Sequence, residues 1–258
     1  MRNSKKLWHI GITLVFLFIF SIQLNAFSFS DNFNRNDNSS IGNGWLVHAG
    51  GTQGISDSKM VIDNGTSESI GDNFAYYNLG KTLDQALVTG VISFSSCNHS
   101  FYIGINATAP EIQANPYKNY WSTSGKGYGF ELNTHTDEYF LMDNTSLGNY
   151  ANPSTSLQAG SFALNHNQDY NFELNYKEDK SLEVRFWAVG GSRPSTASFQ
   201  YTPGTLPSYS GKHIAFGITD EGTLYIDDLL VTTSIPEPSS LFLLGSFLLA
   251  GVIFSRKK

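Results

Sequence analysis

Residues 115–125 form the segment whose side chains are best suited to bind a ligand. Three aromatic residues, Tyr117, Tyr120 and Trp121, stand there among asparagine, serine and threonine residues. Sugar rings present apolar C–H faces that stack on aromatic rings, while amides bind sugar hydroxyls. Trp187 is a fourth candidate, because it falls on the polar side of an alternating segment. The pattern predicts a glycan-binding surface; the alternative is that these rings cover one end of a hydrophobic core.

Residues placed for catalysis are harder to find in this sequence. A retaining glycosidase needs two carboxylates about 5 Å apart, which one strand can supply from alternate positions. Glu131 and Glu173 each stand singly, and the adjacent pairs 137–138 and 227–228 would point to opposite faces of a strand. No Gly-x-Ser-x-Gly or His-x-x-x-His spacing occurs. We therefore expect a non-catalytic protein, with a secreted glycan hydrolase or lyase as the alternative.

The elements that would position these residues read as β-strands. In residues 170–176 the apolar side chains alternate with polar ones, and residues 182–188 repeat the pattern. A period of two places one set of side chains on a buried face and the other in water. The polar residues 177–180 lie between the two segments, so we expect a hairpin with its turn there.

Further runs of this kind fill the central part of the chain. They lie at residues 29–33, 45–49, 59–62, 74–78, 86–95, 101–106, 128–133, 139–143, 161–164, 198–201, 214–219 and 223–233. The 19 Phe, 13 Tyr and 24 Gly residues suit half-buried pleated surfaces joined by tight turns. The sequence predicts an all-β fold, a single two-sheet antiparallel β-sandwich.

The start and end of this region resemble a known kind of β domain. Residues 31–35 and 39–45 carry the pattern Asp-x-Phe-x-Arg followed by Ser-x-x-Gly-x-Gly-Trp, and residues 224–231 read as a closing strand. Both are similar to the corresponding parts of bacterial concanavalin A-like (laminin-G-like) jelly rolls. The resemblance implies a jelly-roll fold rather than any particular activity.

In jelly rolls of that kind the first and last strands run side by side, which implies a meeting of acidic residues. Asp31 would then lie near Asp227 and Asp228. Adjacent carboxylates repel each other, and a hard cation with oxygen ligands, such as Ca²⁺, would relieve the repulsion. Ca²⁺ is therefore the one cofactor that we expect. The alternative is that Asp31 and Asp228 stabilise turns or bulges and bind no metal.

The N-terminal residues 1–26 have the features of a secretory signal peptide. Arg2, Lys5 and Lys6 precede an apolar run at residues 7–20, and Ala26 supplies a small residue for cleavage. We expect this segment to form a helix that is removed on export. The alternative is an uncleaved membrane anchor.

The C-terminal tail combines a proline motif, an apolar stretch and a basic cluster. These are Pro236, Glu237 and Pro238, then residues 239–255, then Arg256, Lys257 and Lys258. The apolar stretch is barely long enough for a transmembrane helix, and the basic cluster would stay on the cytoplasmic side. The order resembles the PEP-CTERM sorting signal, which implies processing by an exosortase-type enzyme in a Gram-negative bacterium that makes exopolysaccharide. The alternative is an ordinary tail anchor.

These interpretations divide the chain into a signal peptide (1–26), a β-sandwich domain (27–234) and a sorting segment (235–258). The two ends hold six of the 16 basic residues and one of the 22 acidic ones, which leaves the domain with a formal net charge of −11. Such a domain lacks a basic surface for phosphates, so nucleic acid is not an expected partner. We expect an exported protein of the cell surface or biofilm matrix, held transiently in the inner membrane by its tail. Its expected partner is exopolysaccharide or another glycan; the alternative is a structural sandwich with no ligand.

Overall fold

The computed structural model describes residues 27–48, 52–65, 73–95, 100–107, 128–143, 158–202, 211–218 and 221–233. The contacts of the chain divide it into a unit at Ser28–Thr233 and a unit made of Met1–Phe27 and Ser234–Lys258. The signal helix, the transmembrane helix and the sorting motif expected at the two ends lie outside the described residues. No helix of the described part is long and apolar enough to cross a membrane.

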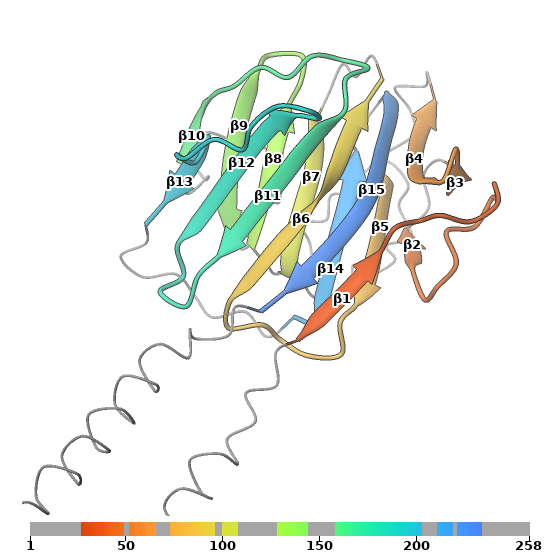
Figure 1. Ribbon diagram of the computed structural model, residues 1–258, viewed down its shortest axis with the longest axis horizontal. Helices are drawn as coiled ribbons and strands as arrows, with labels where there is room; N and C mark the ends of the chain where they lie inside the picture. The colour runs from red at the N-terminus through yellow and green to blue at the C-terminus, as the bar shows by residue number, and fades with distance from the viewer. Residues whose placement is uncertain are drawn as a thin grey trace, which may run out of the picture. The chain divides into compact units, whose positions relative to one another are not determined.

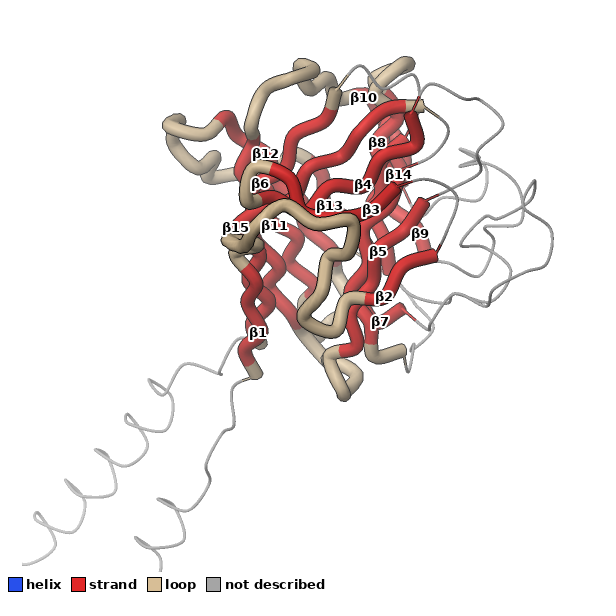
Figure 2. The backbone as a smooth tube through the Cα atoms, turned by 90° about the vertical axis from the view of Figure 1, so that its right-hand side faces the viewer, coloured by secondary structure: helices blue, strands red, loops and turns tan. Residues whose placement is uncertain are grey.

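Two antiparallel sheets make up the unit Ser28–Thr233 (Figure 1). The eight-stranded sheet runs in the order β13 (Phe199–Tyr201), β12 (Leu182–Ala188), β11 (Tyr170–Tyr176), β6 (Ala86–Phe94), β15 (Gly222–Thr232), β4 (Lys59–Gly65) and β3 (Thr52–Ser56), with β1 (Ser28–Asp31) paired to β15. The seven-stranded sheet runs in the order β10 (Gln158–Ser161), β9 (Glu138–Asp143), β8 (Tyr128–Asn133), β7 (Ser100–Ala107), β14 (His213–Ile218), β5 (Asn73–Asn78) and β2 (Leu46–His48). The sheets form a sandwich, and Figure 2 shows their strands in a second view. The predicted fold class is confirmed.

The alternating pattern of the sequence decides which side chains fill the sandwich. In β11, Phe172 and Leu174 are fully buried and their neighbours along the strand face the other way. The hairpin expected between β11 and β12 is present, with Tyr176 opposite Leu182. Its turn is closed by the backbone N–H of Lys180, which donates to the carbonyl of Lys177 over 2.9 Å.

Aromatic rings from the two sheets meet in the core. Phe130 of the seven-stranded sheet packs against Phe186 and Phe199 of the eight-stranded sheet, with ring centroids 5.4 and 5.1 Å apart. Tyr128 stacks on Tyr176 in the same way at 4.7 Å. Burying one such ring stabilises the fold by roughly 1.5–3 kcal/mol. Because these positions face inward, the residues between them in each strand lie on the two outer faces of the sandwich.

Candidate functional site

The outer face of the seven-stranded sheet carries a second apolar cluster, apart from the sandwich core. Phe74 and Ala215 are 2 % and 3 % exposed there, and the half-buried rings of Tyr76 and Tyr102 pack against them. The rings of Phe74 and Tyr102 lie with centroids 5.7 Å apart. Aromatic residues gathered on the outside of a sandwich are not needed to hold its two sheets together. They mark this face as the candidate binding surface.

Strand register arranges this face in two parallel rows. The first row is Phe74, Gly217, Tyr102 and Glu131, contributed by β5, β14, β7 and β8 in turn. The second row is Tyr76, Ala215, Gly104 and Gly129 from the same four strands. Directly opposite residues on one face of a sheet are near neighbours. A row of rings ending in a carboxyl group therefore lies beside a row of small residues; we call the two rows together the aromatic strip.

Glycine fixes how the phenyl ring of Phe74 lies on the sheet. A Cβ atom at Gly217 would stand 2.0 Å from Cδ1 of Phe74, so the ring rests directly on the glycine backbone. At Gly129, by contrast, the only described atom that a Cβ would meet within 4 Å is the Ile103 carbonyl oxygen, at 3.5 Å. The position of the Phe74 ring thus depends on Gly217, whereas the space above Gly129 is uncrowded within the described part.

Glu131 is the acidic member of the aromatic strip. It is 3 % exposed and lies between the core residues Phe130 and Leu132, so its own side chain points outward. Burial raises the pKa of its carboxyl to about 7, against the opposing effect of a hydrogen bond from the Ser100 hydroxyl. Its Oε2 has no hydrogen-bond partner among the described residues. A buried carboxyl oxygen without a partner is a place where a ligand donor would be stabilising.

At the other end of the aromatic strip, Tyr76 meets the imidazole of His213. The two rings lie 5.6 Å apart in an edge-on arrangement. Burial raises the pKa of the Tyr76 hydroxyl, so the phenol stays protonated through the neutral range and can donate a hydrogen bond. The strip therefore combines the half-buried rings and phenol groups of Tyr76 and Tyr102 with one buried acceptor.

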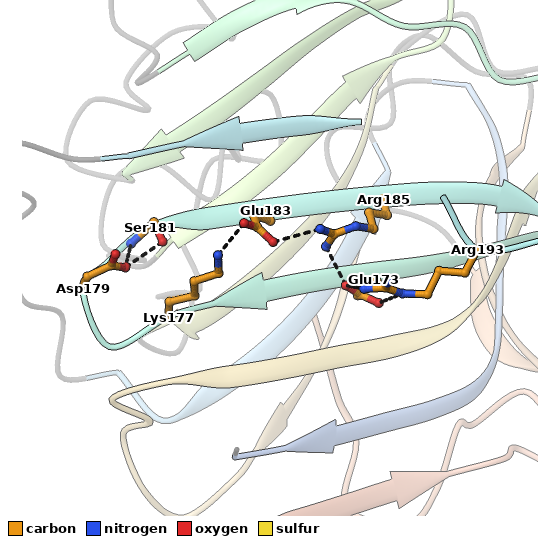
Figure 3. A network of polar contacts seen from close by, with 7 residues as sticks. All are labelled: Glu173, Lys177, Asp179, Ser181, Glu183, Arg185 and Arg193. Carbon is orange, nitrogen blue, oxygen red and sulfur yellow. Dashed lines mark hydrogen bonds and ion pairs between the residues drawn. The ribbon is translucent and has the colours of Figure 1, made fainter. Parts of the chain in front are cut away.

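The outer face of the eight-stranded sheet has a different character (Figure 3). Glu173 of β11 is 5 % exposed, but Arg185 of β12 donates to it over 2.7 Å. Arg193, in the segment that follows β12, donates to both carboxylate oxygens of Glu173 over 2.7 Å each. Glu183 bonds Arg185 on its other side at 3.0 Å and also pairs with Lys177. Burial alone would raise the pKa of Glu173, but the two arginines outweigh it and lower the pKa below its ordinary value.

Trp187 also lies on the eight-stranded sheet, directly opposite Asn171. It is half-buried and points to the same side as Arg185, two residues earlier in β12. Its placement on the polar side of the strand is as expected. It belongs, however, to a different sheet from Phe74, Tyr76 and Tyr102. The other aromatic candidates, Tyr117, Tyr120 and Trp121, lie outside the described residues.

Of the three carboxylates expected to hold Ca²⁺, those of Asp31 and Asp227 have other partners. Asp31 accepts hydrogen bonds from Nη1 and Nη2 of Arg35 at 2.8 and 3.0 Å and from Nε1 of Trp45 at 3.0 Å. These contacts outweigh burial and lower the pKa of Asp31. Asp227 accepts the backbone N–H of Asp228 at the bulge in β15. No cluster of three or more His, Cys, Asp or Glu residues that could hold a metal ion occurs in the described part.

The sequence carried a signal for the aromatic strip that residue type alone did not reveal. Residues 73–78 place aromatic side chains on both faces of β5, since Phe74 and Tyr76 alternate with Ala75 and Tyr77. A strand with one wet face would show polar residues at every second position. Two apolar faces indicate that the outer side of the strand is covered or binds something. Glu131 stood out only as a single carboxylate.

Comparisons with known proteins agree on the fold. No family model and no curated protein matches this sequence. Among solved structures, the potassium-bound carbohydrate recognition domain of Emp46p is 11 % identical, with a TM-score of 0.58 over 79 % of this chain and 95 % of that one. Basic winged bean lectin with Tn-antigen is 13 % identical, with a TM-score of 0.57 over 82 % and 100 %. The Ca²⁺/Man2-bound exoplasmic domain of VIP36 is 11 % identical, with a TM-score of 0.60 over 81 % and 88 %. At identities this low, the likeness shows the fold alone, which is a lectin-like jelly roll.

Proposed function

We propose that this protein is an exported, non-catalytic glycan-binding protein that binds its ligand on the aromatic strip of the seven-stranded sheet. The observation that carries the proposal is the cluster of Phe74, Tyr76 and Tyr102 outside the sandwich core. Support also comes from the similar structures, which include a carbohydrate recognition domain and a lectin with Tn-antigen. Aromatic faces gain stabilisation from the C–H faces of sugars, and phenol groups bind their hydroxyls.

The location of the protein is part of the same proposal. The signal peptide at residues 1–26 and the tail with Pro236, Glu237 and Pro238 would export the domain and present it to an exosortase-type enzyme. The glycan partner would then be exopolysaccharide outside the inner membrane. An acidic domain binds neutral or cation-bridged glycans more readily than anionic ones. Ca²⁺ stays a candidate cofactor. Tyr117, Tyr120 and Trp121 stay candidates for glycan contacts.

One observation favours glycan hydrolysis as a second candidate function. A carboxyl group with a pKa near 7, as in Glu131, suits a general acid. Hydrolysis needs a second carboxylate about 5 Å away, or up to about 9.5 Å for inversion. The residues directly opposite Glu131 are Tyr102 and Phe140, neither of which is acidic. Binding without cleavage is therefore the better-supported function.

A binding assay on the full-length protein in mild detergent tests the proposal. Gel retardation by soluble mannan, galactan, xylan and glucan, with and without Ca²⁺, is compared for the wild type and Tyr102→Ala. The matched control is Tyr225→Ala, a half-buried tyrosine on the outer face of the eight-stranded sheet. We expect Tyr102→Ala to weaken retardation about tenfold and the control to retain it. Equal retardation of both variants would remove the aromatic strip as the site, and newly formed reducing ends would show hydrolysis.

A further inference from the structure

The buried carboxyl of Glu131 is the polar group that the fold of the described part leaves least satisfied on the aromatic strip. Its hydrogen-bond partner is the Ser100 hydroxyl. Its Oε2 accepts nothing from the described residues, although Glu131 is only 3 % exposed. Buried polar atoms in native proteins nearly always have partners. A missing partner on a candidate binding face points to a donor that the ligand brings.

The described neighbours of Glu131 supply no positive charge. On β7 the outward residues beside it are Ser100, Tyr102 and Gly104, and its own strand contributes Gly129 and Asn133. On β9 the nearest acidic residue is Glu138, which is exposed and accepts a hydrogen bond from Oγ1 of Thr136 at 2.9 Å. The outward positions of these three described strands thus contain no Lys or Arg facing Glu131. Nothing there would hold an anionic ligand.

Resting on the proposed function, we infer that Oε2 of Glu131 accepts a hydrogen bond from a hydroxyl group of the bound glycan and that this contact selects neutral sugars over acidic ones. A sugar hydroxyl both donates and stays uncharged, so it completes Oε2 without bringing a second anion. The negative charge of a uronic acid or a sulfated sugar would repel the carboxylate of Glu131 within an apolar surface. Unlike charges attract and like charges repel most strongly where water is excluded. Tyr102, next in the row, is half-buried and would stack on the same sugar ring.

The contact between Glu131 and the sugar hydroxyl makes the binding affinity depend on pH. A donated hydrogen bond is stronger to the ionised carboxylate than to the neutral acid, so the ligand lowers the pKa of Glu131 when it binds. Binding of a neutral glycan therefore releases a proton, and affinity rises with pH through the range in which free Glu131 titrates, near 7. An acidic glycan has the opposite dependence, because it tolerates only the protonated form.

Matched pairs of polysaccharides test the inference on the full-length protein. β-Mannan is compared with polymannuronate, and cello-oligosaccharides with glucuronan; each pair differs in the oxidation of the sugar C6 to a carboxylate. Affinity is measured from about pH 5.5 to about pH 8.5 for the wild type, Glu131→Gln and Glu178→Gln. Glu178 is an exposed residue in the turn between β11 and β12. Its variant therefore loses the same charge from the eight-stranded sheet, which does not carry the aromatic strip. Thermal melting of each variant reports folding.

We expect the wild type and Glu178→Gln to bind a neutral probe about tenfold more tightly at the upper pH, and Glu131→Gln to bind it with no pH dependence. At the upper pH the acidic member of each pair should bind at least about tenfold more weakly than the neutral one. A neutral probe that binds equally at all pH values, or a pH dependence that survives in Glu131→Gln, would overturn this inference and leave the proposed function standing. Absence of binding by these four probes and by the galactan and xylan of the retardation assay would overturn both.

Discussion

The tetrapeptide Phe-Glu-Leu-Asn occurs twice, once in β8 at residues 130–133 and once in β11 at residues 172–175. In both copies the phenylalanine and leucine fill the sandwich core and the glutamate points outward, 3 % exposed at Glu131 and 5 % at Glu173. The two carboxyl groups nonetheless differ in the direction of their pKa shifts. Burial raises the pKa of Glu131 to about 7, whereas Arg185 and Arg193 hold that of Glu173 below its ordinary value.

The cross-strand neighbours cause this difference. Glu173 lies opposite Arg185 and Thr89, while Glu131 lies opposite Tyr102 and Phe140. A buried carboxylate with two arginines is neutralised and locked in place. Glu131, which lies beside Tyr102 and has no arginine opposite it, keeps a raised pKa, and its Oε2 has no hydrogen-bond partner among the described residues. The carboxylates of the eight-stranded face are therefore closed into ion pairs, whereas the seven-stranded face holds a buried carboxyl without an arginine partner among the described residues.

Removal of Arg185 should have the largest effect on this comparison. Arg185→Met removes one buried partner of Glu173 and leaves Lys177 as the remaining ion-pair partner of Glu183 among the described residues. Breaking a buried pair from one side costs about 3–5 kcal/mol, and we expect a loss near the lower value because Arg193 still holds Glu173. Urea unfolding measures it. Arg193→Ala is the control, since Arg193 is 50 % exposed and should cost about 1 kcal/mol; equal losses in the two variants would contradict the account.

Stability against pH should separate the two glutamates. The pKa of Glu131 is raised from 4.5 to about 7. The folded protein therefore loses stability as this group ionises: the loss is absent below about pH 4.5, grows as the pH rises and is complete above about 7. That shift corresponds to about 3 kcal/mol lost across the interval. Glu173 acts in the opposite direction: its pKa is lowered, so its contribution is present above about pH 4.5 and disappears as the pH falls further.

Denaturant unfolding at a series of pH values measures both effects. In Glu131→Gln the decline between about pH 4.5 and 7 should vanish, while the loss at lower pH remains. In Glu173→Gln the acid loss should shrink, while the decline toward neutrality remains. A wild-type stability that stays level between these two pH values would show that Glu131 does not titrate there.

The duplicate tetrapeptide also shows what the sequence could and could not predict. Its period of two correctly predicted the strands and the hairpin turn at residues 177–180, because alternation is a property of one strand. The aromatic strip depends instead on register: Phe74, Tyr102 and Glu131 are far apart in the sequence and meet only because β5, β14, β7 and β8 are aligned in that order. The two identical tetrapeptides therefore gave no reason to expect different surroundings for Glu131 and Glu173. Their partner strands give the two carboxyl groups opposite pKa shifts.

Asp31 illustrates the same limit. The expected pairing of the first and last strands suggested that Asp31, together with Asp227 and Asp228, would be available to a metal. In the structure the arginine and tryptophan of the pattern Asp-x-Phe-x-Arg with a later Trp, Arg35 and Trp45, are themselves the partners of Asp31. The motif is a self-contained polar cluster at the start of the domain, and residue types alone did not show that its members bind one another.

Crowding at the aromatic strip should affect stability to an intermediate degree. In Gly217→Ala the new methyl group would stand 2.0 Å from Phe74, so the ring must leave its seat on the sheet. Overpacking of this kind costs about 1–3 kcal/mol, and Tyr102 would lose the ring that it packs against. Gly129→Ala is the matched control, because its methyl meets only the Ile103 oxygen at 3.5 Å among described atoms. Thermal unfolding and glycan retention should both fall in the first variant; comparable losses in the second would mean that Phe74 is not the cause.

The smallest effect is expected from Trp187, and it sharpens the contrast between the two faces. Trp187 was a glycan-binding candidate from the sequence, but it lies on the eight-stranded sheet beside Arg185, away from the rings of β5 and β7. If binding belongs to the seven-stranded face, Trp187→Ala should change glycan affinity less than about twofold, whereas Tyr102→Ala changes it about tenfold. Affinity electrophoresis with the polysaccharide that the wild type retains measures both variants in one gel. A loss at Trp187 as large as that at Tyr102 would place a sugar contact on the arginine-bearing face as well, and the division of roles between the two sheets would fail.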